Sequence, residues 1–256
     1  MFTKAIVRPP GESFAAGLTS VDLGKPDHEL ALQQHAAYCR VLRSCGLELT
    51  TLQPDRRYPD STFVEDTAIV TDRGAVITRL GAESRRGETE EIEHQLQGQY
   101  PELHRILAPG TVDGGDICEA ENHFFIGVSR RTNEAGATQL DRIFALLGYT
   151  SSLIDIRGLS NILHLKSGMA YLGANRLAVI EGLSGHAEFS GYELVRVNSD
   201  EEYAANCLFI NGQVLVAAGF PNLTGQLEDL NYPTIALEMS EFRKMDGGLS
   251  CLSLRF

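Results

Sequence analysis

Apolar residues of this chain gather in pairs of short runs, and each pair is separated by a few turn-forming residues. Four such pairs occur, at 67–79, 116–128, 169–180 and 206–218. Glycine, asparagine and aspartate between β-rich runs are the usual signal of a β-hairpin. A stretch of small and polar residues precedes each pair, and a fifth such stretch near the end is followed by a single apolar run. The pattern predicts five repeated units.

The repeat is imperfect but regular enough to indicate an architecture. Counted from Asp60, Asp113, His164, Tyr203 and Asp246, the spacings are 53, 51, 39 and 43 residues. A period of this size is typical of propeller-like arrays. The fifth unit lacks a second strand, which the N-terminal apolar run at 4–7 can supply, and this pairing removes an exposed sheet edge. We expect a closed five-bladed α/β propeller of ββαβ-like repeats around a pseudo-fivefold axis, with both chain ends held in one sheet.

Helical periodicity fills the intervals between the hairpins. One helix begins at Pro26-Asp27 and ends before Gly46, a second runs over 88–99, and a third extends from the cap at Asn133 to Gly148. The apolar positions predicted to face inward are Leu30, Ala37, Val41, Leu42 and Cys45 in the first helix, Ile92 and Leu96 in the second, and Ala137, Leu140, Phe144 and Leu147 in the third. Shorter helices are expected near 186–189 and 224–230. With no linker or low-complexity tract, the chain is interpreted as one domain, residues 1–256.

Composition narrows the possible partners. The 256 residues include 34 acidic and 22 basic side chains, a formal charge of −12. This balance argues against nucleic acid, whose phosphates favour Lys and Arg, and against an anionic membrane surface. A small cationic substrate is compatible with it. The five cysteines have irregular spacings and no Cys-x-x-Cys, which indicates a reducing compartment. With neither a membrane span nor a signal peptide predicted, we expect a cytoplasmic protein.

Polar residues of the five stretches would converge if those stretches occupy equivalent places around the axis. The residues concerned are Asp60, Glu65, Asp66, Asp113, Asp116, His164 and Cys251. Several carboxylates facing one pocket raise one another's pKa values unless a cation is present. A guanidinium suits such a site because carboxylates meet its donors bidentately. Opposite a cysteine nucleophile, His164 would be the expected general acid and base.

Each residue also has a simpler structural interpretation. Cys251 could be an inert buried thiol, and His164 a structural histidine. Asp60 and Asp113 could be ordinary turn residues, with Asp116 bonding the backbone of the tight Gly-Gly turn. The remaining acids could form a solvated strand edge. The arginine pairs at 85–86 and 130–131 could be solubilising charge, or one arginine of each pair could hold a substrate carboxylate. The glycine-flanked loop around Leu18 could act as a lid.

Taken together, the motifs resemble those of the dimethylarginine dimethylaminohydrolases, bacterial type, in the guanidine-modifying pentein superfamily. The likeness covers nearly the whole chain and rests on Gly-Leu-Thr-Ser with Leu-Gly-Lys-Pro-Asp, Phe-Val-Glu-Asp, Gly-Ala-Glu-Ser-Arg-Arg-Gly-Glu-Thr, Asp-Gly-Gly-Asp, Arg-Thr-Asn, Leu-His-Leu-Lys-Ser, Ala-Ala-Asn-Cys and Asp-Gly-Gly-x-Ser-Cys. Mammalian members carry a second cysteine directly after the nucleophile, where this chain has Leu252.

The resemblance implies roles for individual residues. Cys251 would be the nucleophile, His164 the proton donor and acceptor, and Asp113 the acidic catalytic residue. Asp60, Glu65 and Asp66 match positions around the guanidinium and the amino end of the substrate. Leu18, Arg85, Arg131 and Met245 match further substrate contacts, Met245 through its backbone.

The implied reaction hydrolyses Nω-methylated arginine to citrulline and a methylamine through a covalent thiouronium, with Asp66 and Asp113 holding the guanidinium. No cofactor and no metal are implied, and the protein would be a monomer or homodimer. An arginine deiminase or a citrulline ureidohydrolase would use the same core. A non-enzymatic binding factor of this fold, such as a ribosome anti-association factor, would lack the nucleophile.

Overall fold

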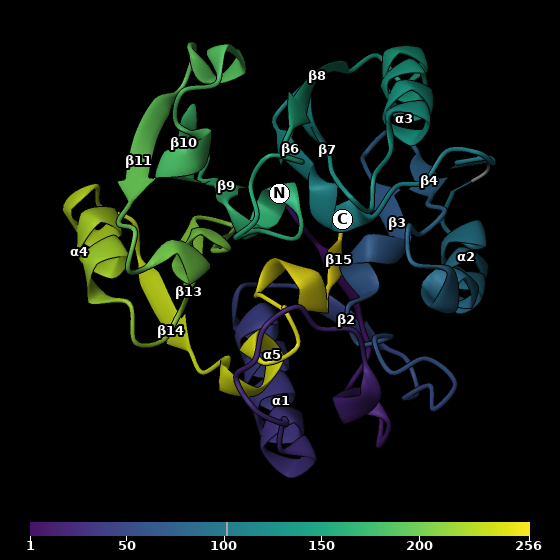
Figure 1. Cartoon of the computed structure of the whole chain (residues 1–256), viewed down its shortest axis with the longest axis horizontal. Helices are drawn as coiled ribbons and strands as arrows, with labels where there is room; N and C mark the ends of the chain where they lie inside the picture. Colours follow the sequence, from purple (N-terminus) through teal and green to yellow (C-terminus); the bar gives the residue numbers. More distant parts are fainter. Residues whose placement is uncertain (101) are drawn as a thin grey trace.

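The computed structural model describes residues 1–100 and 102–256, and its strands form five small sheets of three strands each. The sheets lie around a central axis, and the longer helices lie on the outside of the ring (Figure 1). This arrangement is the five-bladed α/β propeller that the repeated sequence pattern predicted.

All five blades share one strand pairing. The first strand pairs antiparallel with the second, and the second pairs parallel with the third. The blades are β15 (Leu254–Arg255), β1 (Lys4–Val7) and β2 (Glu48–Thr51); β3 (Ala68–Val70), β4 (Ala75–Ile77) and β5 (Leu103–Arg105); β6 (Ile117–Ala120), β7 (His123–Val128) and β8 (Thr150–Asp155); β9 (Met169–Tyr171), β10 (Arg176–Ile180) and β11 (Glu193–Val197); and β12 (Leu208–Ile210), β13 (Gln213–Ala217) and β14 (Thr234–Leu237).

A parallel third strand requires a crossover connection, which places a helix between the second and third strands. The crossover helices are α1 (His28–Ser44), α2 (Thr89–Gln97), α3 (Glu134–Leu146) and α4 (Pro221–Asp229). In the β9–β11 blade the crossover contains two 3-10 turns, Glu181–Leu183 and Ala187–Phe189, where the sequence predicted a short helix. A further short helix, α5 (Ser240–Arg243), precedes the C-terminal segment.

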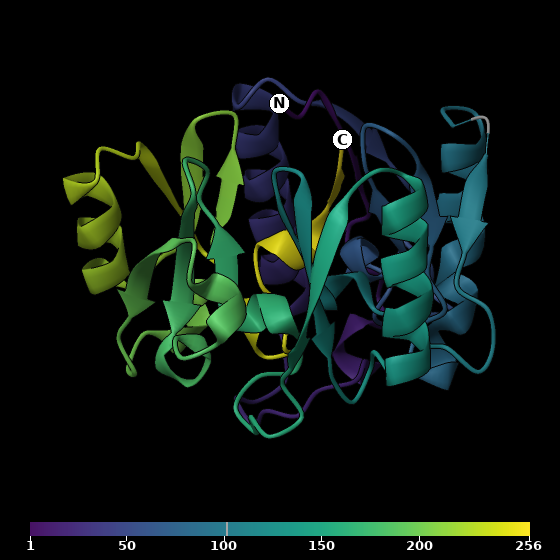
Figure 2. The ribbon, with the colours of Figure 1, turned by 90° about the horizontal axis from the view of Figure 1, so that it is seen from above.

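The N-terminal strand completes the last blade, as predicted. β1 lies between β15 and β2, with Ala5 opposite Arg255 and Ile6 opposite Leu254. The Asn211 side chain, from the neighbouring blade, hydrogen-bonds to both the N–H and the C=O of Phe2. The two chain ends emerge on one face of the molecule (Figure 2). The segment after Cys251 is therefore held in a sheet, which keeps a cysteine so near the chain end in a fixed position.

The five polar stretches form 3-10 turns that lead into the first strand of each blade. These turns are Val64–Thr67, Gly114–Asp116, Leu165–Ser167, Glu202–Ala205 and Ser250–Leu252. Neighbouring turns contact one another near the axis. The polar side chains of distant chain segments consequently meet at the centre of the ring.

The predicted inward faces hold for two of the three long helices. Ile92 and Leu96 of α2 are buried, as are Ala137, Leu140 and Phe144 of α3, while Leu147, the C-cap residue of α3, is half-buried. In α1 the predicted face is partly wrong, because Leu30 is exposed and the buried side chains are Ala31, Gln34, His35, Tyr38, Cys39 and Leu42. Two polar residues share this face because they find partners there: Gln34 bonds to Ser240 and Glu241, and the His35 ring lies 3.6 Å from the Cys39 sulfur.

Within 1–100 and 102–256, no helix has the length and apolar character that crossing a bilayer requires.

Candidate active site

A small hollow at the centre of the ring gathers eight of the ten residues predicted for the site. Its walls are formed by Leu18, Asp60, Phe63, Asp66, Arg85, Arg131, Leu163, His164, Met245, Asp246, Gly247 and Cys251. The hollow has a volume of about 20 Å³, which is room for a single water molecule. Asp113 and Glu65, the two other predicted residues, do not line it.

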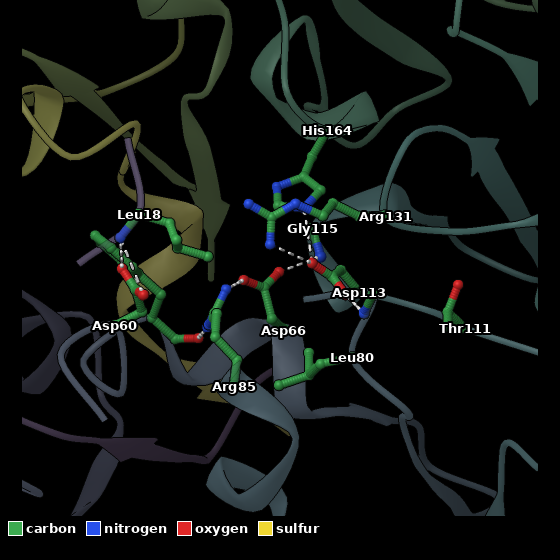
Figure 3. Close-up of polar contacts among 12 residues, drawn as sticks. Leu18, Asp60, Asp66, Leu80, Arg85, Thr111, Asp113, Gly115, Arg131 and His164 are labelled. Carbon is green, nitrogen blue, oxygen red and sulfur yellow. Dashed lines mark hydrogen bonds and ion pairs between the residues drawn. The ribbon is translucent and has the colours of Figure 1, made fainter. Parts of the chain in front are cut away.

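Asp113 lies behind the hollow as the partner of His164 (Figure 3). Its side chain is completely buried, and Oδ2 lies 3.1 Å from His164 Nε2. Its other oxygen accepts a hydrogen bond of 2.8 Å from the Gly81 backbone N–H. The resemblance implied that Asp113 holds the guanidinium, but a carboxylate without exposed surface favours the other role, that of orienting the imidazole.

The surroundings of His164 favour its charged form. Burial by itself would lower the pKa of this imidazole, but the negative charges of Asp66 and Asp116 and the hydrogen bond to Asp113 outweigh burial and raise the pKa to about 9. At neutral pH His164 is therefore an imidazolium, the form that can donate a proton to a leaving group.

The surroundings of Cys251 favour its neutral form. Burial, together with the charges of Glu65 and Asp66, raises the pKa of the thiol to about 12, although the Gly248 N–H donates a hydrogen bond to the sulfur at 3.4 Å. The sulfur is held in place through the preceding residue, because the Ser250 N–H donates to Asn206 Oδ1. In the protein alone Cys251 is a thiol, and a nearby positive charge is needed to make it a thiolate.

Asp66 and Arg85 form a buried pair on one wall of the hollow. Arg85 Nη1 lies 2.7 Å from Asp66 Oδ2, and the rest of the guanidinium binds both oxygens of Glu88. The second oxygen of Asp66 accepts from the Gly115 N–H. Burial disfavours the charge on Arg85, but Glu88 and Asp66 outweigh it and keep its pKa well above the usual value. Arg85 is thus engaged mainly in holding Asp66.

Arg131 is the arginine with a free donor facing this region. Its Nη1 is buried without a hydrogen-bond acceptor, and the nearest carboxylate oxygen, on Asp113, is 4.0 Å away. Buried polar atoms in folded proteins almost always have partners. Of the two arginines predicted to bind a substrate carboxylate, the geometry therefore favours Arg131.

Asp60 connects the hollow to the loop that contains Leu18. Both its oxygens accept from the Leu18 N–H, at 3.0 and 3.2 Å. Burial raises the pKa of this carboxyl, and the Arg85 charge opposes that effect. The same loop is held by Asp246, whose carboxylate accepts from the N–H and the hydroxyl of Ser20. Asp246 lines the hollow and was not among the predicted site residues, although it precedes two glycines just as the predicted Asp113 does.

The Glu65 carboxylate lies elsewhere, so a substrate contact through this side chain is not supported. Its oxygens bind Lys166 and Arg255 at 2.7 Å each and the Ser250 hydroxyl at 2.7 Å. Burial opposes ionisation of Glu65, but the two cations lower its pKa. The position next to Asp66 in sequence suggested a shared role, yet within a 3-10 turn adjacent side chains point in different directions.

Asp116 also differs from expectation, because it does not bond its own turn. It accepts hydrogen bonds from the Leu165 N–H and from the hydroxyls of Ser129 and Thr132. Its partners come from other segments of the chain, so no local sequence pattern could have predicted them.

Three groups are close enough to be compared with a metal site. Ligand atoms of Asp66, Asp113 and His164 lie within 4.8 Å of one another. Each of these groups already has a protein partner, His164 is an imidazolium, and Arg85 and Arg131 stand beside the cluster. The donor set therefore does not fit a metal cation.

Fold and site together define the class: a cysteine, an imidazolium and several carboxylates meet at the axis of a five-bladed α/β propeller of the pentein type. A family model described as "N,N dimethylarginine dimethylhydrolase, eukaryotic" matches residues 23–184. The chain belongs to the dimethylarginine dimethylaminohydrolase family.

Full-length relatives agree with this assignment. The chain is similar to the N(G),N(G)-dimethylarginine dimethylaminohydrolase of Pseudomonas aeruginosa, with 47% identity over 100% of both chains, and to that of Streptomyces coelicolor, with 35% identity over 98% of this chain and 96% of the relative. A solved structure of the Pseudomonas aeruginosa protein, a cysteine-to-serine mutant complexed with citrulline, superposes with a TM-score of 0.97 over 100% of both chains. An arginine dihydrolase domain from Cyanobacteria, 15% identical, shows the same fold with a TM-score of 0.88 over 100% of this chain and 97% of that one.

Proposed function

We propose that this protein hydrolyses Nω-methylated arginines to citrulline and methylamine or dimethylamine. The proposal rests on one observation: the thiol of Cys251, the imidazolium of His164 and the carboxylates of Asp60 and Asp66 line a single hollow. It is supported by the citrulline complex of the 47% identical relative. A flat cation with an amino-acid end complements this set of charges.

Binding of the substrate completes the site electrostatically. Asp66, fixed by Arg85 and Gly115, accepts hydrogen bonds from the guanidinium and places its central carbon opposite Cys251. The positive charge beside the sulfur lowers the pKa of the thiol, which releases its proton to solvent. At the other end, Asp60, Leu18 and the Met245 backbone face the substrate amino group, and Arg131 binds its carboxylate.

The reaction then follows two covalent steps. The Cys251 thiolate forms a bond to the guanidinium carbon, and the C–N bond to the methylated nitrogen breaks as His164 protonates the departing amine. The product of this step is a thiouronium on the sulfur. Neutral His164 next takes a proton from a water molecule, whose oxygen bonds to the carbon while the C–S bond breaks. The hydroxyl proton of the adduct passes to the departing sulfur, neutral citrulline leaves, and the resting thiol and imidazolium are restored.

The turnover test uses four compounds separately: asymmetric dimethylarginine, monomethylarginine, arginine and citrulline. Released citrulline, amine and ammonia are measured for each. We expect citrulline and an amine from the two methylated compounds. Cys251→Ser should abolish turnover and keep the thermal unfolding midpoint, and Cys118→Ser is a matched control because this buried thiol is away from the hollow. Citrulline formation by Cys251→Ser at the wild-type rate would contradict the mechanism.

Arginine deiminase activity is the alternative with the same core. It predicts ammonia and citrulline from arginine, with the methylated substrates slower. A ureidohydrolase would instead consume citrulline. The product assay separates all three reactions.

The hollow is too small for an arginine-sized substrate, so groups around it must move before a substrate can enter. A volume of about 20 Å³ is far below the roughly 300–1,000 Å³ of ordinary ligand pockets. We propose that the 17–26 loop is the lid, because Leu18 and Ser20 hold it over the site through Asp60 and Asp246. The closed loop excludes water during the first covalent step.

We further propose that residues 1–256 act as one catalytic domain in the cytoplasm, as a monomer or homodimer, without a cofactor. All five cysteines are unpaired thiols, which suits a reducing compartment.

A further inference from the structure

Asp116 is the centre of a buried hydrogen-bond network directly behind the site. The residue has no exposed surface and does not line the hollow. Its carboxylate accepts three hydrogen bonds, and each donor belongs to a different residue, Leu165, Ser129 or Thr132. Each of these donors is linked to a residue of the proposed reaction.

The first branch reaches His164. The Leu165 N–H donates to Asp116 Oδ1 at 2.9 Å. This amide belongs to the peptide unit that contains the His164 carbonyl, so the bond fixes the backbone on which the imidazole is mounted. Rotation of that peptide would move the ring away from Asp113.

The second branch reaches Arg131. The Ser129 hydroxyl donates to Asp116 Oδ2 at 2.7 Å and accepts from the Arg131 N–H at 2.9 Å and from the Thr132 N–H at 3.0 Å. A hydroxyl has a single proton, so its donation to the carboxylate turns the lone pairs towards the amide. Asp116 thereby determines how Ser129 holds the Arg131 backbone.

The third branch reaches Asp113. The Thr132 hydroxyl donates to Asp116 Oδ2 at 2.6 Å and accepts from the Asp113 N–H at 3.1 Å. Hydrogen bonds to an ionised acceptor are about twice as strong as neutral ones. The third branch therefore fixes the backbone of the residue that orients His164.

Packing restricts the network on the side of β7. A Cβ atom at Gly127 would lie 3.0 Å from Asp116 Oδ1 and 2.8 Å from Leu165 Cβ. The glycine in β7 allows the carboxylate to approach the His164 segment closely. The Asp116 carboxylate is thus held by its three hydrogen bonds and is also closely packed against β7 at Gly127.

We propose that Asp116 is a positioning residue for the hydrolysis, and that its three hydrogen bonds set the relative placement of His164, Asp113 and Arg131. This inference rests on the proposed function for its kinetic readouts. Asparagine is the informative substitute: it keeps the shape but offers one acceptor oxygen in place of two, so at least one branch loses its acceptor.

The first experiment compares Asp116→Asn with Glu201→Gln. Glu201 is a matched control because its buried carboxylate accepts the Asn222 and Leu223 N–H groups at the start of α4, away from the hollow. We expect kcat to fall about tenfold or more in Asp116→Asn, equivalent to about 1.4 kcal/mol in the barrier, and to stay within about twofold in Glu201→Gln. The wild-type kcat in both variants would overturn the proposal.

The second experiment tests the branches and keeps the proposal testable if Asp116→Asn does not fold. Ser129→Ala should raise KM about threefold to tenfold with little change in kcat, because it releases the Arg131 backbone. Thr132→Val should lower kcat to a similar extent, and Thr132→Ser should restore it. Thr71→Val is the control, a buried threonine whose hydroxyl serves only the β3–β4 turn. A general loss of stability would not change KM in one variant and kcat in the other. Identical kinetic effects of Ser129→Ala and Thr132→Val would therefore refute separate roles for the two branches.

A substrate-independent readout separates this proposal from the proposed function. The imidazole resonance of His164 is recorded by NMR in each variant. We expect it to shift in Asp116→Asn and Thr132→Val and to stay at the wild-type position in Glu201→Gln and Thr71→Val. If the His164 signal does not shift in Asp116→Asn, the positioning role of Asp116 is refuted. If the wild-type protein turns over none of the four compounds, only the proposed hydrolysis is refuted.

Discussion

Replacing Asp113 by asparagine changes the atom that faces the proton of His164 Nε2. In the wild-type protein this proton points at Asp113 Oδ2, 3.1 Å from the nitrogen, inside a fully buried pair. The substituted side chain would keep the volume and the bond from the Gly81 N–H, but it would lack the negative charge. The imidazolium would then depend on Asp66 and Asp116 for compensation.

The expected magnitude follows from the strength of a hydrogen bond to a charged group, about 1.5–3 kcal/mol. Since a change of one in pKa corresponds to about 1.4 kcal/mol, the pKa of His164 should fall from about 9 by about one to two. Asp66 and Asp116 should keep it above the usual value of a histidine.

The same shift predicts how stability depends on pH. A histidine with a raised pKa in the folded protein contributes stability that is fully present below about pH 6.5 and is lost as the pH rises towards about 9. In Asp113→Asn this contribution should be smaller and should disappear at a lower pH. Urea unfolding of the two proteins at about pH 6 and pH 9 measures the difference.

NMR titration of the histidine Cε1 protons from about pH 5 to pH 11 tests the prediction directly. His123 is an internal control, because partial burial lowers its pKa and it lies in another part of the fold. Its midpoint should be the same in both proteins. A His164 midpoint in Asp113→Asn equal to or above that of the wild type would refute the assignment of Asp113 as the group that stabilises the imidazolium.

Three further variants test other parts of the structure. Arg131→Ala should raise KM about tenfold to a hundredfold with a smaller change in kcat, because it removes one charged hydrogen bond to the substrate carboxylate; steady-state kinetics decide, and an unchanged KM would assign that carboxylate to another residue. Glu65→Gln should lower the free energy of unfolding by about 3 kcal/mol, since this buried carboxylate is the shared anion of Lys166 and Arg255, whose side chains are 14% and 11% exposed; an unfolding energy equal to that of the wild type would contradict this. Asn211→Ala should lower the free energy of unfolding by about 1–3 kcal/mol through loss of its bonds to Phe2 and Cys45, and a thermal midpoint unaffected by the change would show that the N-terminal strand is held without it.

The repeated pattern predicted the propeller because turn residues within each unit mark its hairpin in the sequence. Turn residues such as Asn211 and Gly212 mark the hairpins, and both adopt positive φ values, +48° and +89°, in the structure. The closing strand at 4–7 was predicted from a global requirement, that an open sheet edge be covered. Local signals and one topological argument were sufficient for the fold.

The face of α1 and the role of Glu65 could not be predicted in this way. Gln34 and His35 look like solvent-facing positions, and only the distant Ser240 and Glu241 and the neighbouring Cys39 make their burial favourable. Ser240 and Glu241 are distant from α1 in the sequence, and the contact between His35 and Cys39 is buried only because of the way α1 packs. Hydrophobic periodicity records burial of apolar groups and carries no information on polar pairs.

The resting charges of the site explain why a cationic substrate suits it. Glu65 lies outside the hollow and is paired with two cations, yet its charge still acts on Cys251 and adds to the negative surroundings of the sulfur. Asp60 and Asp66 line the hollow, and the burial-raised pKa of Asp60 shows that its charge is incompletely compensated. The same excess of negative charge helps to raise the pKa of Cys251 to about 12, so without a ligand the nucleophile is protonated. A guanidinium bound in the hollow supplies the missing positive charge. It pairs with the carboxylates of Asp60 and Asp66, and it stabilises the thiolate of Cys251. Because a neutral urea such as citrulline lacks that charge, the cysteine returns to its thiol form when the product forms.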